Sequence, residues 1–315
     1  MSRIFSPTAS FIISTLLLTA CLGGGGGGGG GGSSGGTGLV SFGITDSPVT
    51  DAQNVVVSFD CLELKSANSG RITFEFDPPE KIDLLQLQGN EFAKLITDEL
   101  VPSGQYQWAR LCVISDKAND QDSYVILKNS ARFPLYVPSG DESGLKINTN
   151  YFVLQDGSTS YTIDFDLHKS LHDPQGFPAY ILRPTLRLVN NNQVGSISGT
   201  VLQDTCIGIG DDIDDAAVYV FSGDVAPDDQ NSADTTDIDP VTTAIVKLDT
   251  ADGMYKYTAG FIDGSNGGKQ YTVALTCQYS GDYPDQDDTI LFNDTPINTT
   301  NPVTVIAGQS TQVDF

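Results

Sequence analysis

Most residues of this 315-residue chain that could bind a metal ion or take part in acid–base chemistry are acidic. Asp and Glu number 40 against 16 Lys and Arg, which gives a net charge of −24. Twenty Asp and three Lys lie from Gly195 onward. Loop carboxylates spaced one to three residues apart are ligands of the type that calcium prefers. Seven of them are candidate calcium ligands: Asp211, Asp212, Asp214, Asp215, Asp285, Asp287 and Asp288.

The same residues have a simpler interpretation. Asp favours turns because its carboxylate accepts hydrogen bonds from nearby backbone amides, and an acidic excess also keeps a protein soluble. The chain has no EF-hand pattern of alternating Asp, Gly and a Glu at the twelfth position. Calcium and solvated turns therefore both stay open, and no other cofactor is implied. The charge argues against a nucleic-acid partner, because binding to phosphates needs a basic surface.

Residues typical of enzymes are scarce. The chain has two histidines: we expect His168 on the polar face of a strand and His172 in the loop that follows. Outside the Gly-rich run over 23–38, Cys-x-x-Cys, His-Glu-x-x-His and Gly-x-Ser-x-Gly motifs do not occur, nor do phosphate loops or dinucleotide fingerprints. We therefore expect no enzymatic activity.

Two further groups could bind or cleave sugars. Asp164 and Asp166 project from one strand face as a carboxylate pair, and glycosidases use two carboxylates. Arg183 and Arg187 could instead neutralise that pair. An aromatic surface for stacking on sugars could be built from Tyr106, Trp108, Tyr279 and Tyr283. Aromatic residues in strands are more often part of the packed sheet.

The first 38 residues predict export, an anchor and a spacer. A positive start, an apolar stretch over 11–18 and small residues before Cys21 are typical of a signal peptide over 1–20. Leu18-Thr19-Ala20-Cys21 resembles the bacterial lipobox, which implies that Cys21 is acylated and holds the protein in a lipid bilayer. Leu22, where Asp would favour the inner membrane, resembles an outer-membrane signal. Residues 21–38, with ten consecutive Gly, form a disordered tether of about 20–24 Å.

Four cysteines remain once Cys21 is lipidated. Cys61 and Cys112 lie in the first half of the chain, and Cys206 and Cys277 lie in the second. Disulfides persist in exported proteins, so we expect pairing, although buried free thiols are the alternative. Of the three possible pairings, separate domains favour Cys61–Cys112 and Cys206–Cys277.

Residues 39–193 predict an all-β module. Apolar and polar side chains alternate over 40–44 and over 161–167, which predicts strands with one buried and one solvated face. The phase of the alternation changes between Phe59 and Leu62, so we expect a β-bulge near Asp60-Cys61. Residues 84–96 break the alternation and suit a short helical or irregular crossover, which ends at Pro102-Ser103-Gly104.

This module resembles a bacterial family, domain of unknown function 4382. The resemblance rests on motifs that occur in order: Gly43-Ile44-Thr45-Asp46-Ser47-Pro48, Ile82-Asp83-Leu84-Leu85-Gln86-Leu87-Gln88-Gly89, Leu100-Val101-Pro102-Ser103-Gly104-Gln105-Tyr106, Asp164-Phe165-Asp166-Leu167 and Leu182-Arg183-Pro184-Thr185-Leu186-Arg187. The resemblance implies an exported, lipid-anchored domain. It supplies no catalytic residues, and His168 stands where the family pattern has Arg or a similar residue.

Residues 195–315 predict a second β-module. A Gly-x-Ile-x-Gly-x-Val start at Gly195, an Ala-x-Val strand near Val218 and an Asp-Gly turn at Asp252 resemble the carboxypeptidase regulatory-like domain. That resemblance implies a small, non-enzymatic, prealbumin-like sandwich. The fold expected for the whole chain is therefore all-β, with two Ig- or prealbumin-like sandwiches in tandem behind the tether.

The function expected is non-catalytic. We expect a lipid-anchored outer-membrane protein, facing the periplasm or the cell surface, that serves binding, adhesion or envelope structure. Its partners would be the bilayer, through Cys21, and an envelope or extracellular ligand that the sequence does not identify. The alternatives are an accessory hydrolase that uses carboxylates on polysaccharide or peptide, and a calcium-stabilised spacer.

Overall fold

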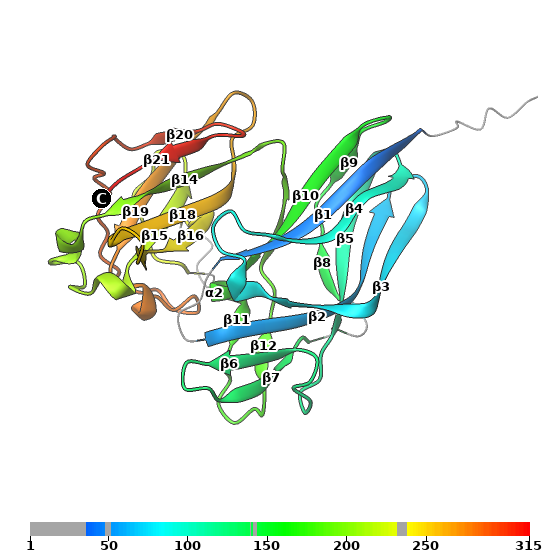
Figure 1. The fold of residues 1–315 in the computed structure, drawn as a ribbon, viewed down its shortest axis with the longest axis horizontal. Coiled ribbons are helices and arrows are strands. Elements are labelled where there is room, and N and C mark those ends of the chain that lie inside the picture. The colour runs from blue at the N-terminus through cyan, green and yellow to red at the C-terminus, as the bar shows by residue number, and fades with distance from the viewer. Residues whose placement is uncertain (1–35, 48–51, 139, 141–143, 232–237) are drawn as a thin grey trace, which may run out of the picture. The chain divides into compact units, whose positions relative to one another are not determined.

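The computed structural model describes residues 36–47, 52–138, 140, 144–231 and 238–315 (Figure 1). Almost all regular elements in these residues are strands, so the all-β prediction is confirmed. Residues Gly35–Phe315 form one compact unit. The predicted signal peptide, Cys21 and most of the tether lie outside the described residues. No helix in the described part is long and apolar enough to cross a membrane.

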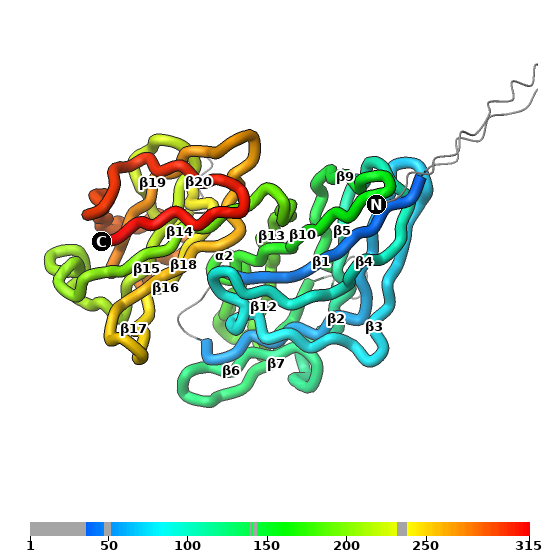
Figure 2. The backbone as a smooth tube through the Cα atoms, turned by 45° about the horizontal axis from the view of Figure 1, so that its top comes forward, coloured from blue at the N-terminus to red at the C-terminus, as the bar shows by residue number. Residues whose placement is uncertain are grey.

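The first half of the chain contains two facing sheets. One sheet has the order β13-β10-β1-β4 and is formed by Leu186–Asn190, Ser158–Asp166, Thr37–Ser47 and Ala93–Pro102. Strand β1 runs parallel to β10 and antiparallel to β4 (Figure 2). Because β1 begins at Thr37, it starts two residues before the predicted module.

The second sheet is larger and has the order β11-β12-β7-β6-β2-β5-β8, with β3 beside β2 and β9 beside β5. Its strands are β2 (Ala52–Ser66), β3 (Gly70–Asp83), β5 (Gly104–Ile114), β6 (Tyr124–Leu127), β7 (Arg132–Tyr136), β8 (Leu145–Ile147), β9 (Tyr151–Val153), β11 (Leu171–His172) and β12 (Tyr180–Leu182). Phe42 and Phe165 from the first sheet share a single apolar core with Leu62 and Leu111 from the second, so the pair forms a sandwich.

The second half contains two four-stranded sheets with a core of their own. One has the order β17-β18-β14-β21 and the other β16-β15-β19-β20. Their bounds are β14 (Val194–Val201), β15 (Ala217–Ser222), β16 (Thr242–Ile245), β17 (Lys247–Asp249), β18 (Met254–Asp263), β19 (Lys269–Thr276), β20 (Val303–Val305) and β21 (Ser310–Gln312). Ile197 and Ala259 from one sheet meet Val218 and Val273 from the other in that core.

No described strand pairs across the region between β13, which ends at Asn190, and β14, which begins at Val194. The sheets thus separate where the sequence predicts the boundary between 39–193 and 195–315. The division into two folding domains stays a prediction, because the structure describes one compact unit.

The expected bulge in β2 is confirmed. The pairing of β2 with both β3 and β5 shifts between Phe59 and Cys61. The expected crossover over residues 84–96 is confirmed only in part. Leu84–Gln86 forms the 3-10 helix η1, but the end of the range, from Ala93 onward, belongs to strand β4. Leu95 and Ile96 therefore pack from a strand.

The prediction for His168 is wrong. Strand β10 ends at Asp166, and Leu167–Ser170 forms the short helix α2, in which the Asp166 side chain accepts a hydrogen bond from the backbone amide of Lys169. The face of β10 that was expected to be solvated is also buried, because Asp164 is 6% exposed and Thr162 is 0% exposed. The remaining 3-10 helices are η2 (Gln203–Cys206), η3 (Ile213–Asp215) and η4 (Tyr279–Gly281).

Both disulfides join the cysteines that the sequence pairs within each half. Cys61 is bonded to Cys112, its direct neighbour across β2 and β5. Cys206 in η2 is bonded to Cys277 after β19. All of the cysteines in the described residues are thus paired, which suits an oxidising compartment.

Candidate functional site

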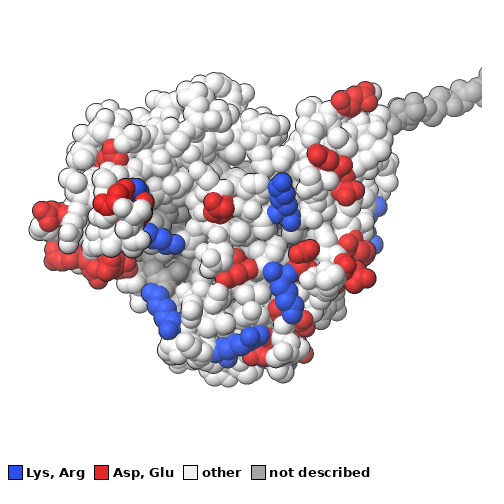
Figure 3. Space-filling model, viewed as in Figure 1, with Lys and Arg blue, Asp and Glu red and all other residues white. Residues whose placement is uncertain are grey.

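Four of the predicted calcium ligands, Asp211, Asp212, Asp214 and Asp215, lie in η3 or just before it, and three of their carboxylates accept hydrogen bonds. The Asp211 carboxylate accepts a hydrogen bond from the Gly208 amide at 2.8 Å, and Asp212 accepts one from the Asp214 amide at 3.0 Å. Asp215 accepts two hydrogen bonds from Ser280. Figure 3 shows acidic side chains at the left edge of the view, where Figure 1 draws the yellow-green loops of residues 202–216. In the described residues these four carboxylates do not converge on one point.

The other three predicted ligands are divided. The exposed Asp285 carboxylate lies 3.5 Å from Nδ1 of His172, and the exposed Asp287 makes no hydrogen bond or ion pair with a described residue. Asp288 lies in a group with Asp229 and Asp282, in which one oxygen from each carboxylate is within 4.8 Å of the other two. We call these three residues the carboxylate cluster.

The carboxylate cluster joins two loops of the second half. Asp229 comes from the loop between β15 and β16, whereas Asp282 and Asp288 follow η4. Asp229 and Asp282 are each 1% exposed. Asp229 Oδ2 accepts the Asp288 amide at 2.5 Å, and Asp282 accepts the Gln230 amide and the Tyr219 hydroxyl. The loops are therefore held together by hydrogen bonds to buried carboxylates.

Burial makes the carboxylate cluster electrostatically costly. Burial, together with the charges of Asp229 and Asp288, raises the pKa of Asp282 to about 6 against the opposing hydrogen bonds from Tyr219 and Gln230. Burial likewise raises the pKa of Asp229, although the amide of Asp288 opposes that rise. A buried carboxylate near other carboxylates favours either a proton or a bound cation.

The raised pKa of Asp282 predicts a pH-dependent stability. Asp282 binds its proton more tightly in the folded protein than in the unfolded chain, where its pKa is about 4. Its contribution to the free energy of unfolding is present below about pH 4 and is lost as the pH rises through about 6. A shift of two units corresponds to a loss of up to about 3 kcal/mol.

Urea unfolding between pH 4 and 8 tests this contribution. Asp282→Asn should be more stable than the parent chain at pH 7, and this advantage should disappear by pH 4. The titratable groups that face Asp282 are Asp229, Asp288, Tyr219 and His168, which the variant keeps, so the difference between the two proteins isolates Asp282. Parallel profiles for the two proteins would contradict the assignment.

His168 lies against the same loop. Its Nε2 is 2.8 Å from the backbone carbonyl oxygen of Asp282, and its ring stacks on Tyr279 with centroids 4.8 Å apart. His172 contacts Asp285. Both histidines therefore contact the loop after η4, His168 from α2 and His172 from β11. The prediction that His172 lies in a loop is thus wrong, because this residue belongs to a short strand.

The Asp164 and Asp166 carboxylates are occupied by internal partners. Arg187 places both Nε and Nη2 2.5 Å from Oδ2 of Asp164. Asp166 accepts a hydrogen bond from the Gln230 side chain at 2.9 Å. Burial raises the pKa of both carboxyls, with the charges of Arg187 and Lys169 acting in opposition. Such a pair is not open to a sugar substrate.

The four aromatic residues proposed for stacking on sugars do not form one surface. Tyr106 is 0% exposed and Tyr279 is 1% exposed, so both belong to packed regions. Trp108 is half-buried, with the Lys146 ammonium 4.8 Å from its ring centroid. Tyr283 alone among them is an exposed large side chain.

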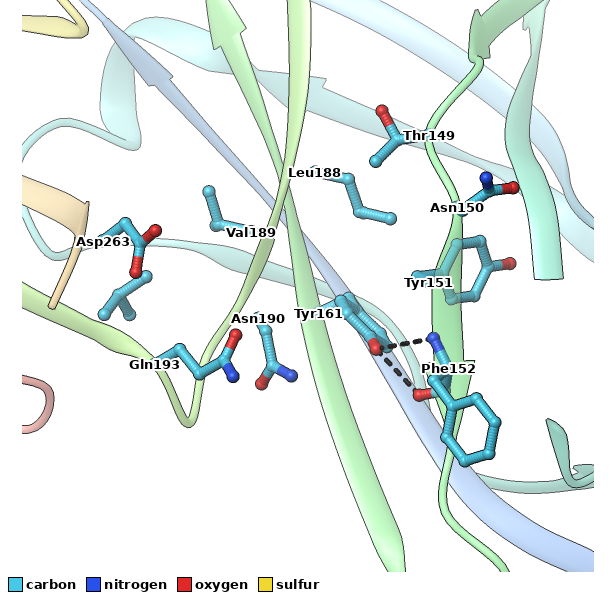
Figure 4. A pocket seen from close by; sticks show the side chains of 11 residues that line it. Thr149, Asn150, Tyr151, Phe152, Tyr161, Leu188, Val189, Asn190, Gln193 and Asp263 are labelled. Carbon is cyan, nitrogen blue, oxygen red and sulfur yellow. Dashed lines mark hydrogen bonds between the residues drawn. The ribbon is translucent and has the colours of Figure 1, made fainter. Parts of the chain in front are cut away.

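A different aromatic side chain borders a hollow of about 380 Å³. Phe152, in β9, is 53% exposed at its rim. Tyr151, Tyr161 and Leu188 also line the hollow, and the Tyr161 hydroxyl donates to the Phe152 carbonyl at 2.8 Å. Figure 4 shows Thr149, Asn150 and Phe152 on one side, and Asn190, Gln193 and Asp263 on the other. The apolar part of the hollow is thus fixed by internal contacts.

The polar part of the hollow has free hydrogen-bonding groups. The side-chain amides of Asn150 and Gln193 make no hydrogen bond with a described residue. Asn190 Oδ1 accepts the Asn192 amide at 3.0 Å, which leaves its NH₂ group unused. Asp263, the charged lining residue, is paired with Lys269. The sequence gives no signal for this site because its residues come from four separated segments, and isolated Asn and Gln in loops carry no pattern.

Solved structures similar to this chain are distant. Candidate polysaccharide-binding proteins (DUF1812) from Bacteroides thetaiotaomicron share 12% identity over 75% of this chain and 76% of theirs, with a TM-score of 0.19. The fimbrial anchor protein Mfa2 from Porphyromonas gingivalis shares 11% over 81% and 82%, with a TM-score of 0.16. A candidate adhesin from Bacteroides ovatus shares 7% over 88% and 92%, with a TM-score of 0.19. Likenesses this low carry no argument about function.

The comparison with protein families is more informative. No curated protein matches the chain. Residues 37–184 match the family described as "Domain of unknown function (DUF4382)", in agreement with the motifs of the first module. The similarity to this family therefore covers residues 37–184, in the first half of the chain.

Proposed function

We propose that this chain is a lipid-anchored protein of the outer membrane that binds neutral carbohydrate without turnover. The observation that carries the ligand class is the hollow in Figure 4, where unused amide groups surround an exposed aromatic ring. A sugar presents hydroxyl groups that amides can bind and an apolar face that an aromatic ring can cover. The second half, in this proposal, is a non-enzymatic sandwich of the carboxypeptidase regulatory-like type.

Charge supports a neutral ligand. The chain carries a net charge of −24, so its long-range field repels anionic polymers. Among the lining residues of the hollow, Asp263 carries a charge, and Lys269 neutralises it. A cationic ligand would find no free carboxylate among the described lining residues. Neutral sugars therefore fit the hollow better than acidic or basic ligands.

The absence of turnover is supported by how the candidate catalytic groups are used. Asp164 is buried against Arg187, and Asp166 is bound to Gln230. His168 and His172 hold loops in place. A hydrolase would need a carboxylate or imidazole that can reach the substrate, so binding suits this geometry better than the hydrolase alternative.

Binding to neutral oligosaccharides tests the ligand class. The full chain in detergent should bind members of a panel of hexose and N-acetylhexosamine oligomers in calorimetry. Phe152→Ala should weaken binding at least about tenfold, which corresponds to about 1.4 kcal/mol. The matched control is Leu154→Ala, since Leu154 lies two residues away and is 50% exposed but does not line the hollow.

The two possible failures have different meanings. No binding to any oligomer would reject neutral carbohydrate as the ligand. Binding that Phe152→Ala and Leu154→Ala reduce equally would place the carbohydrate elsewhere on the protein and reject the hollow.

A further inference from the structure

The geometry points to a site for a calcium-class divalent cation in the carboxylate cluster, formed by Asp229, Asp282 and Asp288. Of these three residues, only Asp288 is among the seven candidate ligands that the sequence predicts. The site is independent of the carbohydrate hollow, because the two sets of residues have no member in common.

The spacing of the carboxylates suits calcium. One oxygen from each of the three residues lies within 4.8 Å of the other two. Two ligands of one Ca²⁺ ion can be up to about 4.6–5.2 Å apart, or twice the Ca–O distance, so three oxygens this close together can share one ion. Mg²⁺ demands near-ideal octahedral geometry and keeps several of its waters, so it suits a site of protein carboxylates less well. A donor set made entirely of carboxylate oxygens also favours a hard cation over zinc or copper. Asp288 is half-buried, which leaves water access to complete the coordination shell.

A buried oxygen without a partner is the second, separate observation. Asp229 is 1% exposed, and its Oδ2 accepts the Asp288 amide, but its Oδ1 has no hydrogen-bond partner. Buried polar atoms in native proteins almost always have a partner. A buried carboxylate oxygen without a partner, in a residue grouped with two further carboxylates, is a suitable ligand for a cation.

Protein cations do not fill this role. Among the described residues, no Lys, Arg or His forms an ion pair with any of the three carboxylates. Three negative charges in a mostly buried place are costly unless a proton or a cation offsets them. At neutral pH a divalent cation offsets two of these charges at once.

Such a cation would join segments that are distant in sequence. Asp229 lies between β15 and β16, and Asp282 and Asp288 follow η4. The backbone carbonyl of Asp282 also contacts His168 in α2. Calcium would therefore fix both loops of the second half at the point where they meet α2 of the first.

Calcium titration of the full chain in detergent, after removal of metals with EDTA, tests the site. At calcium a hundredfold above Kd, the melting temperature should rise by about 5–10 °C. Tb³⁺ should show emission sensitised by Tyr219, whose hydroxyl donates to Asp282, and Ca²⁺ should displace it. Equal magnesium or added NaCl should give a much smaller shift. No calcium shift and no Tb³⁺ emission, or an equal shift with magnesium or NaCl, would overturn the proposal.

Variants locate the cation. Asp229→Asn should weaken calcium binding at least about tenfold, because ligand charge sets the affinity of such sites. Without calcium it should be no less stable than the parent, since Asn keeps the acceptor for the Asp288 amide and removes a buried charge. Asp288→Asn serves as a second variant if Asp229→Asn fails to fold.

The matched control is Asp287→Asn, an exposed neighbour outside the carboxylate cluster, which should retain affinity within about twofold. Asp214→Asn probes the loop around η3 in the same way. Loss of binding in either of these two variants, with retention in Asp229→Asn, would place the cation elsewhere and overturn the assignment.

Discussion

Replacing Arg187 with Met should destabilise the protein by about 3–5 kcal/mol at neutral pH, because the substitution leaves the Asp164 carboxylate buried without its cation. Asp164 is 6% exposed, and both Nε and Nη2 of Arg187 lie 2.5 Å from its Oδ2. The two residues are direct neighbours across β10 and β13. Met keeps much of the apolar stem of Arg, so most of the cost is electrostatic. Urea unfolding of the full chain in detergent measures it.

The cost should depend on pH. Burial already raises the pKa of Asp164, and removal of the Arg187 charge raises it further. Protonation then relieves the variant, so the difference in free energy of unfolding between parent and Arg187→Met should be smaller at pH 4 than at pH 8.

Two controls separate the ion pair from general disruption. The double variant Asp164→Asn with Arg187→Met removes both charges and should recover most of the lost stability. Arg183→Met changes an exposed arginine of the same segment, for which no ion pair is found, and should alter stability by less than about 0.5 kcal/mol. A loss below about 1 kcal/mol for Arg187→Met would show that solvent already screens Asp164.

Much of the fold could be predicted because strands carry a local pattern. Alternation over 40–44 and 161–165 places Phe42, Ile44, Ile163 and Phe165 in one core, as the structure shows. The phase change around Asp60 marks a bulge because one extra residue reverses the face of every residue that follows. These patterns depend only on neighbouring residues, so they can be recognised in a single sequence.

The faces of β10 show where such signals end. Alternation assigns Thr162 and Asp164 to solvent, yet both are buried. Groups from distant parts of the chain lie on this face, since Arg187 is bound to Asp164 and Gln230 is bound to Asp166, and the local pattern cannot show them. The helix α2 was missed for a related reason. It has four residues and begins at Leu167, directly after the N-cap residue Asp166, whose side chain accepts a hydrogen bond from the Lys169 amide without leaving any periodic signal in the sequence.

The candidate sites are harder still to predict, since each depends on long-range contacts. Asp229 and Asp282 stand in acidic runs that resemble the solvated runs beside them. They differ because Asp282 accepts the Gln230 amide, 52 residues away, and its carbonyl meets His168, 114 residues away. The hollow near Phe152 likewise combines four segments. Side-chain type restricts the chemistry in both cases, but the fold selects which of many equivalent residues meet.

Replacing Cys21 with Ser should move the protein from the membrane to the soluble fraction almost completely. Cys21 closes the sequence Leu18-Thr19-Ala20-Cys21, and the four other cysteines are held in disulfides. Several acyl chains on one cysteine give stable anchoring, and the described residues contain no helix that could replace them. Detergent phase partitioning and incorporation of labelled palmitate measure the two consequences.

A change at the next residue separates acylation from destination. Leu22→Asp should leave palmitate incorporation and detergent partitioning intact but shift the protein from the outer to the inner membrane fraction, if the signal works as the lipobox resemblance implies. Membrane association that persists in Cys21→Ser would refute the lipid anchor and require the folded body to bind the membrane. Such binding would have to overcome the net charge of −24, which an anionic lipid surface repels. Insertion of acyl chains into the bilayer does not depend on the charge of the folded body. Loss of these chains should therefore release the whole folded body from the membrane.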